Sequence, residues 1–354
     1  MWLRVDPTIH IHFQADAHDR RGLLVESIRQ QALFELFTPA IVRALMLAGD
    51  WITRVAFEAR LLELGVPRER ASQFVDDLLA HGLLQEAADP HEHAELDERA
   101  RRYAAAGCMA TATLLAAKRH QRYLDYGSAE AWAGEDALMR AYRDDDPPPE
   151  ITKRHADADL LPLPSGPPLD TPQSALTIAW LSSLLRHAFG VTGFLDDPVQ
   201  GRRLRKTHPS GGARHPVECY LVCSQVDGLA PGVHHYAVAE HALALLPGDP
   251  AGDPAALLDE LLPGRRAPLV LVLTVTPARV MWRYREPTSF FAMMLDVGHA
   301  LENFCAACRR AGLPHQPSSE VPTRALARLL DLAWLAEPPV AALAIGDVTG
   351  TEQA

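Results

Sequence analysis

A loop with two adjacent glycines is the stretch of this chain whose residue types best suit ligand chemistry. It reads Thr-His-Pro-Ser-Gly-Gly-Ala-Arg-His-Pro over residues 207–216. Proline fixes φ and lacks an N–H, and glycine can adopt positive φ, so the stretch does not fit a helix. Gly211 and Gly212 leave the backbone bare, which would let a flat ligand lie directly on it; the alternative is an ordinary Pro/Gly turn before a strand. The polar side chains expected at the ligand's edge are those of Ser210, Arg214 and His215.

The loop is flanked by a cationic segment before it and a predicted strand after it. Residues 217–223 are mostly apolar and rich in β-formers, which predicts a buried strand. Residues 202–206 carry four cations in five positions, a pattern typical of a solvated face. Arg203 and Arg205 could also bind a phosphate, because a guanidinium makes paired hydrogen bonds to phosphate oxygens.

The loop resembles the flavin-contacting loop of the nitroreductase superfamily, and within it the SagB-type azoline dehydrogenases that modify peptides. Two further motifs follow in the order that this branch has. Gly-Leu-Ala-Pro-Gly-Val-His-His-Tyr, residues 228–236, is similar to its Gly-x-x-Pro-Gly-x-x-x-Tyr turn. Asp-Val-Gly-His-Ala-Leu-Glu-Asn, residues 296–303, is similar to its Asp-x-Gly-His-x-x-x-Asn helix. Together the motifs cover roughly the C-terminal half, about one domain of chain.

The resemblance implies an FMN-dependent dehydrogenase that oxidises azolines to azoles in a ribosomally made peptide. It also implies an α+β fold with a mostly antiparallel sheet flanked by helices, and a homodimer with FMN at its interface. The precursor peptide would be the substrate, and a cyclodehydratase or other maturation proteins would be further partners. The expected cofactor contacts are Pro209, Ser210, Gly211, Gly212, Arg214, His215, Arg203, Arg205, His299 and Gly346.

A proton acceptor is the second requirement, because azoline oxidation removes a hydride and a proton. The Lys-Tyr pair of the family falls here on Arg283 and Tyr284. A guanidinium has a pKa above about 12 and is a poor base, but it can anchor a carbonyl or a developing negative charge. Tyr284 is therefore the expected base with Arg283 as support; the alternative is that Trp282 and Tyr284 only pack behind a strand. His299 could equally be a structural histidine within a helix.

The phosphate contacts depart from the family pattern. The arginine-rich motif that usually opens the domain is represented only by Lys153, Arg154 and His155. Residues 346–350, after the last predicted strand, lack the arginine of simpler nitroreductases. Which residues would hold the phosphate therefore stays open.

Composition limits the other classes of function. The chain has 354 residues, enough for two domains, and its 48% hydrophobic and 22% charged residues are typical of a globular protein. A net charge of −11 argues against a nucleic-acid partner. No apolar run approaches the ~20 residues of a membrane helix and the N-terminus lacks a signal-peptide layout, so we expect a cytoplasmic protein. Five cysteines with a single Cys-x-x-Cys predict neither a disulfide scaffold nor a metal site.

Residues 1–145 are expected to form a separate N-terminal domain. Apolar periodicity predicts short helices between residues 33 and 82 and an edge strand at 83–86, an order typical of a winged-helix unit. The third of these helices, residues 68–81, carries three acidic residues and is not basic, which argues against DNA binding. In the azoline-dehydrogenase group such a region resembles a clamp for the precursor peptide; the alternative is a purely structural extension.

The flavin domain is expected to span residues 150–354. A charged, proline-stiffened linker at residues 144–149 leads to it. Residues 268–276 predict a buried strand, and residues 287–311 predict a long helix that begins at a proline.

Two other functions remain as alternatives. One is a stand-alone NAD(P)H-dependent nitro- or quinone-reductase on the same fold, which would have no use for a large N-terminal extension. The other is a non-catalytic flavin-fold adaptor in a peptide-maturation complex, which Arg283 and the weak phosphate motifs favour.

Overall fold

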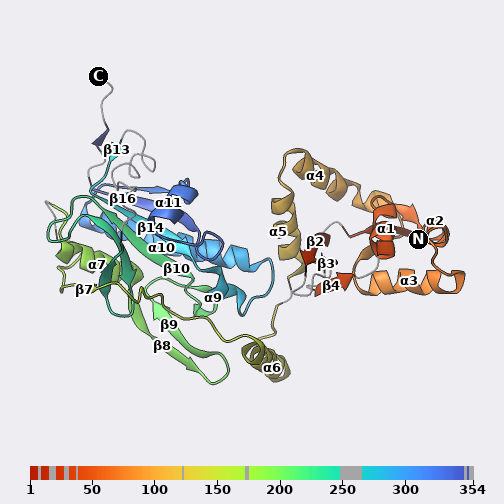
Figure 1. The fold of residues 1–354 in the computed structure, drawn as a ribbon, viewed down its shortest axis with the longest axis horizontal. Helices are drawn as coiled ribbons and strands as arrows, with labels where there is room; N and C mark the ends of the chain where they lie inside the picture. The colour runs from red at the N-terminus through yellow and green to blue at the C-terminus, as the bar shows by residue number, and fades with distance from the viewer. Residues whose placement is uncertain are drawn as a thin grey trace. The chain divides into compact units, whose positions relative to one another are not determined.

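The computed structural model describes residues 1–6, 9–15, 21–27, 32–36, 39–121, 123–171, 175–247, 265–346 and 349–350 (Figure 1). The chain divides into two compact units, one of Met1–Leu124 with Glu286–Thr288 and one of Asp125–Arg285 with Ser289–Ala354. Each unit has its own hydrophobic core. Among the helices of these described residues, none is both long and apolar enough to cross a membrane.

The first unit contains a small antiparallel sheet in the order β5-β1-β6. Its strands are β1 (Trp2–Val5), β5 (Ile52–Thr53) and β6 (Leu84–Ala87). The helices that pack with it are α1 (Pro39–Leu47), α2 (Arg54–Glu63) and α3 (Arg68–Ala80). This order of helix, strand, helix, helix and strand, completed by β1, fits the expected winged-helix arrangement.

Local sequence explains where α2 and α3 begin and end. Thr53 caps α2, because its hydroxyl accepts a hydrogen bond from Ala56 N at 3.2 Å. Gly82, with φ +64°, reverses the chain after α3 so that β6 can follow. Phe57 and Val75, one from each helix, are fully buried in the core shared with β1.

A second sheet of the first unit is antiparallel in the order β2-β3-β4. Its strands are β2 (Ile9–Ala15), β3 (Arg21–Ser27) and β4 (Ala32–Leu36). The remaining elements are the short helix η1 (Pro90–His93), α4 (Ala94–Ala105) and α5 (Met109–His120).

The second unit is built on a seven-stranded sheet in the order β15-β16-β14-β10-β11-β12-β7, in which every described pairing is antiparallel. This confirms the expected mostly antiparallel sheet. Its two central strands, β10 (Val217–Cys223) and β14 (Leu269–Val275), are buried at every residue, as continuous apolar runs predict. The others are β7 (Leu160–Pro162), β11 (Gly232–Ala237), β12 (Ala242–Leu245), β15 (His315–Ser318) and β16 (Pro339–Ile345).

Helices cover both faces of this sheet (Figure 1). On one face α7 (Ile178–Phe189) and α10 (Ser289–Ala311) pack against Leu221 and Leu271. On the other face α11 (Thr323–Leu329) packs against Val222 and Val272. Alternate residues of one strand therefore serve two separate cores, which is the layered α+β fold expected.

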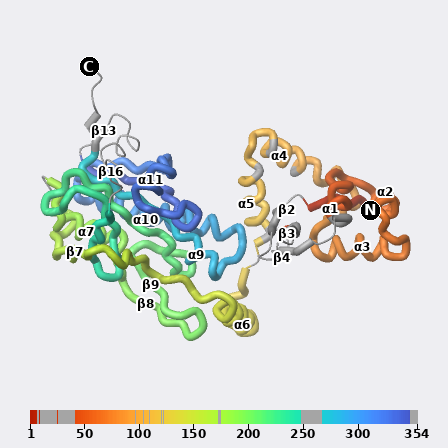
Figure 2. The backbone as a smooth tube through the Cα atoms, viewed as in Figure 1, coloured from red at the N-terminus to blue at the C-terminus, as the bar shows by residue number. Residues whose placement is uncertain are grey.

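The helix α6 (Ala129–Asp145) belongs to the second unit. Its Met139 is buried in a cluster with Val199 and Trp282. Val199 lies in the turn between β8 (Val191–Asp197) and β9 (Gly201–Lys206), and Trp282 directly follows α9 (Pro277–Met281). The chain therefore passes from the first compact unit to the second at residues 124–125, whereas the division into functional domains at 145–150 stays a prediction. The backbone trace in Figure 2 follows this segment through α6 to the sheet.

Candidate functional site

The double-glycine loop connects β9 to β10. Gly211–Ala213 forms a short 3-10 turn, η2. Gly212 has φ +61°, and Ala213 and His215 also have positive φ, at 54° and 43°. Non-glycine residues with positive φ are uncommon and are retained where the surroundings fix them, often at functional sites.

Asp296 of α10 is what fixes the loop. Ser210 Oγ donates to Asp296 Oδ2 at 2.5 Å and Gly211 N donates to Asp296 Oδ1 at 3.2 Å. Ser210 Oγ also accepts from His215 N at 2.8 Å, which closes the turn. Asp296 is only 2% exposed, and burial raises its pKa although the two loop donors oppose that rise. Asp296 is the first residue of the Asp-x-Gly-His motif, although the sequence pointed to His299 rather than Asp296 as the contact.

Tyr284 lies directly against the same loop. A Cβ placed on Gly212 would clash with the Tyr284 hydroxyl, so only glycine fits there. The guanidinium of Arg283 lies 4.8 Å from the Tyr284 ring centroid and forms an ion pair with Glu135 of α6. The structure thus brings Tyr284 to the loop, while the charge of Arg283 is neutralised by α6.

The predicted arginines occupy three different environments. Arg203 donates to Gly212 O at 3.2 Å and to Asp197 Oδ2 at 3.3 Å, so it joins the loop. Arg205 is exposed on the same strand. Arg214 is only 9% exposed, and burial, followed by repulsion from Arg203 and Arg283, lowers its pKa to about 10.

His215 and Gly346 lie away from the exposed loop surface, whereas His299 interacts electrostatically with Asp296 and His208. His215 is 3% exposed and its ring meets that of His208 edge-on at 5.0 Å, so the ring is part of the core. His299 is exposed on α10, three residues after Asp296. Gly346 follows β16 at the end of the sheet opposite the loop, where a side chain would clash with Pro268. Pro209 is an exposed loop residue.

A buried charge network lies beneath the loop, and sequence reasoning did not find it. Glu218 of β10 is fully buried and lies 2.5 Å from Arg279 Nη1 and 3.1 Å from His235 Nε2. Burial alone would raise the pKa of Glu218, but Arg279, His235 and Lys206 together hold it well below its usual range. Arg279 Nη1 also donates to His215 O at 3.2 Å, so the network supports the C-terminal side of the loop.

Lys206 adds a second buried cation at the end of β9. Its Nζ donates to Val217 O at 3.3 Å and lies 4.0 Å from the Phe189 ring centroid. Complete burial lowers the pKa of Lys206 to about 8. The buried side chains beneath the loop therefore include two cations, Lys206 and Arg279, and positive charge there suits a ligand that gains negative charge.

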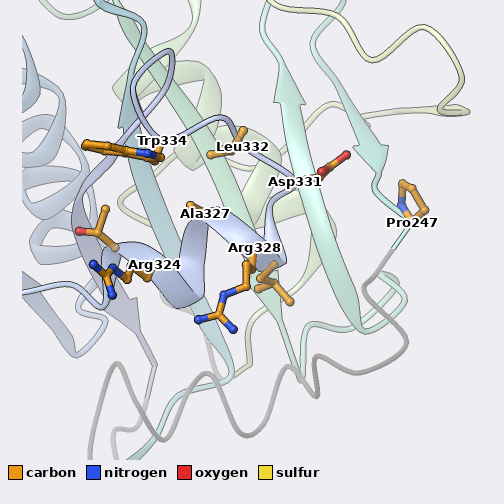
Figure 3. Close-up of a pocket in the computed structure, with 9 residues that line it drawn as sticks. Pro247, Arg324, Ala327, Arg328, Asp331, Leu332 and Trp334 are labelled. Carbon is orange, nitrogen blue, oxygen red and sulfur yellow. The ribbon is translucent and has the colours of Figure 1, made fainter.

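A well-formed cavity lies elsewhere, on the α11 side of the sheet (Figure 3). It measures ≈ 880 Å³, and Trp334, Leu332 and Arg328 are among the residues that line it. None of the predicted site residues contributes to it. Within the described parts of the chain, no group of three or more His, Cys, Asp or Glu side chains is placed to hold a metal ion.

Comparisons with known proteins show which proteins this chain is similar to. The family model described as "Nitroreductase family" matches residues 168–347. The trifolitoxin-processing protein TfxB of Rhizobium leguminosarum bv. trifolii is 32% identical over 177 residues, which are 48% of this chain and 47% of TfxB. The chain thus spans about half the length of that relative.

A second relative and a solved structure are also similar to this chain. "Putative nitroreductase MJ1384" of Methanocaldococcus jannaschii is 30% identical over 142 residues, which are 40% of this chain and 67% of that protein. The E. coli microcin synthetase McbBCD complex with truncated pro-MccB17 bound has a chain that matches at 20% identity and a TM-score of 0.41. The match covers 56% of this chain and 71% of that one. The family model alone covers more than half of the residues, and this chain therefore belongs to the nitroreductase family.

Proposed function

We propose that this chain is an FMN-dependent oxidoreductase that matures a ribosomally synthesised peptide by oxidising azolines to azoles. Membership of the nitroreductase family supports redox chemistry with a flavin. The similarity to a trifolitoxin-processing protein supports a peptide as the substrate. The proposal includes a cytoplasmic homodimer that works with a cyclodehydratase or other maturation proteins.

The observation that best supports a bound flavin is the exposed backbone of Gly211. Its φ is not in the positive range, and a Cβ there would meet only Ala292 Cβ, at an ordinary contact distance of 3.7 Å. Neither backbone conformation nor internal packing therefore requires glycine at this position. A planar ligand lying on the backbone does require it, since any side chain would occupy the plane of that ligand.

The protein's own groups fit the roles that such a cofactor leaves to them. When bound, the flavin supplies the hydride acceptor. Asp296 holds Ser210 and Gly211 in place below the ligand, which keeps the backbone surface preorganised. The hydroxyl of Tyr284, which lies beside Gly212, would take up the substrate proton. Arg203, bonded to Gly212 O, adds positive charge at the edge of the same surface.

Flavin content of purified protein tests the proposal. Wild-type protein is expected to be yellow, with flavin absorbance that survives desalting. Gly211→Leu should fold normally and lose the flavin, because the leucine would fill the ligand's plane. Gly134→Leu is the matched control, since a Cβ at that exposed position of α6 meets nothing within 4 Å, and it should keep full occupancy. Full flavin occupancy in folded Gly211→Leu protein would contradict the assignment of this loop.

Flavin content and activity assays together separate the two alternative functions from the proposed one. A non-catalytic adaptor would purify without flavin and without activity on azoline-containing peptides. A small-molecule reductase would bind flavin and oxidise NAD(P)H with nitroaromatics or quinones, yet leave the precursor peptide unchanged. Mass spectrometry detects azoline oxidation as a loss of two hydrogens per ring.

A further inference from the structure

An exposed tryptophan lies on the turn between α11 and β16. Trp334 is 63% exposed and the next residue, Leu335, is 73% exposed. Within the described part of the chain, the indole of Trp334 makes no ring contact and no hydrogen bond. Neighbouring exposed apolar side chains with polar residues around them often mark interaction sites, and tryptophan is enriched among the residues that contribute most to binding. Trp334 is therefore a candidate contact for a ligand.

The cavity beside Trp334 has the size of a ligand site. Its volume is ≈ 880 Å³, within the range of about 300–1,000 Å³ that is typical of binding pockets. Its apolar lining includes the buried side chains of Ala327 and Leu329 and the partly buried Leu332. This lining favours a ligand that carries at least one apolar group.

Two arginines of α11 line the same cavity (Figure 3). Arg324 and Arg328 are both exposed, and neither has a hydrogen bond or an ion pair among the described residues. They are four residues apart, which places them on one face of the helix with Cβ atoms about 5–6 Å apart. The whole chain has a net charge of −11, so the two arginines form a local positive site on an acidic protein. Such a site suits carboxylates, which form charge-assisted hydrogen bonds with guanidinium groups.

The spacing of the two arginines matches the repeat of an extended peptide. An extended chain rises about 3.3 Å per residue and alternate side chains lie on one face, so residues i and i+2 are about 6.6 Å apart. Acidic side chains at i and i+2 would therefore meet Arg324 and Arg328 in turn. An apolar side chain at i+4 lies on the same face and would cover Trp334. A compact anion such as phosphate would bind the arginines but leave Trp334 exposed.

We propose that the α11 cavity binds an extended acidic peptide segment with the pattern acidic-x-acidic-x-apolar. Arg324 and Arg328 bind the two carboxylates, and Trp334 contacts the apolar side chain. The proposal goes beyond the proposed function and needs no flavin, because no residue of the double-glycine loop lines this cavity.

Fluorescence anisotropy of a labelled peptide, titrated with full-length protein at low salt, tests the site. The probe is a rhodamine-labelled Ser-Glu-Ser-Glu-Ser-Leu-Ser peptide, which wild type should bind saturably. The control peptide, Ser-Glu-Glu-Ser-Ser-Leu-Ser, has the same composition, but its two carboxylates lie on opposite faces of an extended chain. It should bind at least about threefold more weakly, because only one ion pair can form. Absence of saturable probe binding, or equal affinity for the two peptides, would overturn the proposal.

Substitutions at exposed positions identify the residues that bind the probe. Arg324→Gln and Arg328→Gln should each raise its Kd at least about threefold, as expected for one solvent-exposed ion pair. Trp334→Ala should raise the Kd at least about tenfold, because it removes the aromatic contact. Arg310→Gln, which removes an exposed arginine paired with Asp170, should bind like wild type. An unchanged Kd in the double variant of Arg324 and Arg328 would contradict the proposal.

Asp331 provides a test of opposite sign. Its carboxylate lines the same cavity and repels an acidic ligand. Its φ is +50°, a conformation that asparagine also tolerates, so Asp331→Asn should fold normally. This variant should bind the probe at least as tightly as wild type. Weaker binding would show that the cavity does not recognise acidic side chains.

Two further measurements distinguish other occupants. Inorganic phosphate that displaces the probe at concentrations near the Kd of the probe would assign the arginines to a small anion and overturn the peptide proposal. A dimer that sedimentation velocity detects for wild type but not for the double variant of Arg324 and Arg328 would assign the cavity to a second copy of this chain, and would overturn it as well. If the probe binds as expected and no flavin does, this inference stands while the proposed function fails.

Discussion

Gly211 and Gly212 are neighbours that lack side chains for different reasons. Gly212 has positive φ and faces the Tyr284 hydroxyl, so the fold itself excludes a larger residue. Gly211 is free of both constraints, as the proposed ligand on this backbone would require. The sequence could indicate a bare backbone from two glycines between prolines. It could not tell the two glycines apart, because the difference lies in contacts with residues 72 and more positions away.

The burial of two polar residues of the loop also could not be predicted from the sequence. Arg214 and His215 were expected at the edge of a ligand, and the structure buries both as the chain enters β10. Residues 214–223 are all buried, so the residues that directly precede the central strand are buried together with it. Asp296, which fixes the loop, comes from a helix 85 residues further on, and local patterns carry no information on such a pairing.

Replacing Tyr284 with Phe tests its role as proton acceptor. Tyr284→Phe removes one oxygen beside Gly212 and leaves the ring packing intact. A positioned acid–base group contributes about 100- to 10,000-fold, so turnover of an azoline peptide should fall by at least about 100-fold while flavin absorbance stays unchanged. Turnover within a few-fold of wild type would place the base elsewhere, and exposed His299 would be the next residue to test.

At the scale of elements, α6 is the part whose place sequence patterns could not establish. The charged, proline-rich residues 144–149 at its C-terminal end predicted a linker and a domain border instead. In the structure α6 packs on the turn after β8 and on Trp282, contacts that span 60 residues or more. Trp282 Nε1 also donates to Asp146 O at 2.8 Å, so the start of the linker is tied to the segment that carries Tyr284. The two central strands were predictable because each is a single buried apolar run.

Met139 and Leu138 offer a matched test of how α6 is held. Met139 is 1% exposed in the cluster with Val199 and Trp282, whereas Leu138, its neighbour, is 44% exposed. Met139→Ala should destabilise the docked helix by about 2–5 kcal/mol, since it removes buried contacts and leaves a cavity. Leu138→Ala should cost under about 1 kcal/mol. Amide hydrogen exchange of α6 peptides measures both, and equal protection in the two variants would show that this cluster does not hold the helix.

At the scale of the whole molecule, the second unit buries several histidines in neutral form. Burial is the first cause that lowers the pKa of His155 to about 4, of His208 to about 3 and of His215 to about 2. In the unfolded chain these residues take up protons near their ordinary value of about 6.5. The unfolded state therefore binds more protons at any pH between about 6.5 and 4, and stability must fall as the pH is lowered through that window.

Urea unfolding at pH 7.5, 6.0 and 5.0 measures this dependence. The free energy of unfolding should drop by up to about 1.4 kcal/mol per pH unit for each of His208 and His215, and by less for half-buried His155, which solvent partly screens. His208→Gln should reduce the slope by about one third, whereas His187→Gln, at an exposed position of α7, should leave it unchanged. A flat profile between pH 6.5 and 5 would show that these histidines accept protons in the folded state.

The first unit has a core of its own, so its function can be considered separately from that of the second unit. Sequence patterns predicted its winged-helix order of elements but not its second sheet, β2-β3-β4, whose strands pair with one another rather than with β1. Both sheets of this unit have edge strands, β5 and β6 in one and β2 and β4 in the other. Such edges accept an extended peptide by strand addition, with main-chain hydrogen bonds giving affinity and side-chain pockets giving selectivity.

Removal of residues 1–124 tests whether this unit holds the precursor peptide. The cut falls before α6, so the cluster around Met139 stays with the second unit. Tethering a leader raises the effective concentration of the modified segment to about millimolar, and its loss should lower kcat/KM on a leader-bearing precursor by about 100-fold or more. Flavin content and turnover of small nitroaromatics should change little, because the loop, Tyr284 and Asp296 all remain. Titration of full-length protein with the leader peptide alone should show saturable binding that the truncated protein lacks. Unchanged precursor kinetics after truncation, together with no leader binding, would reduce the first unit to a structural extension and favour a reductase of small molecules.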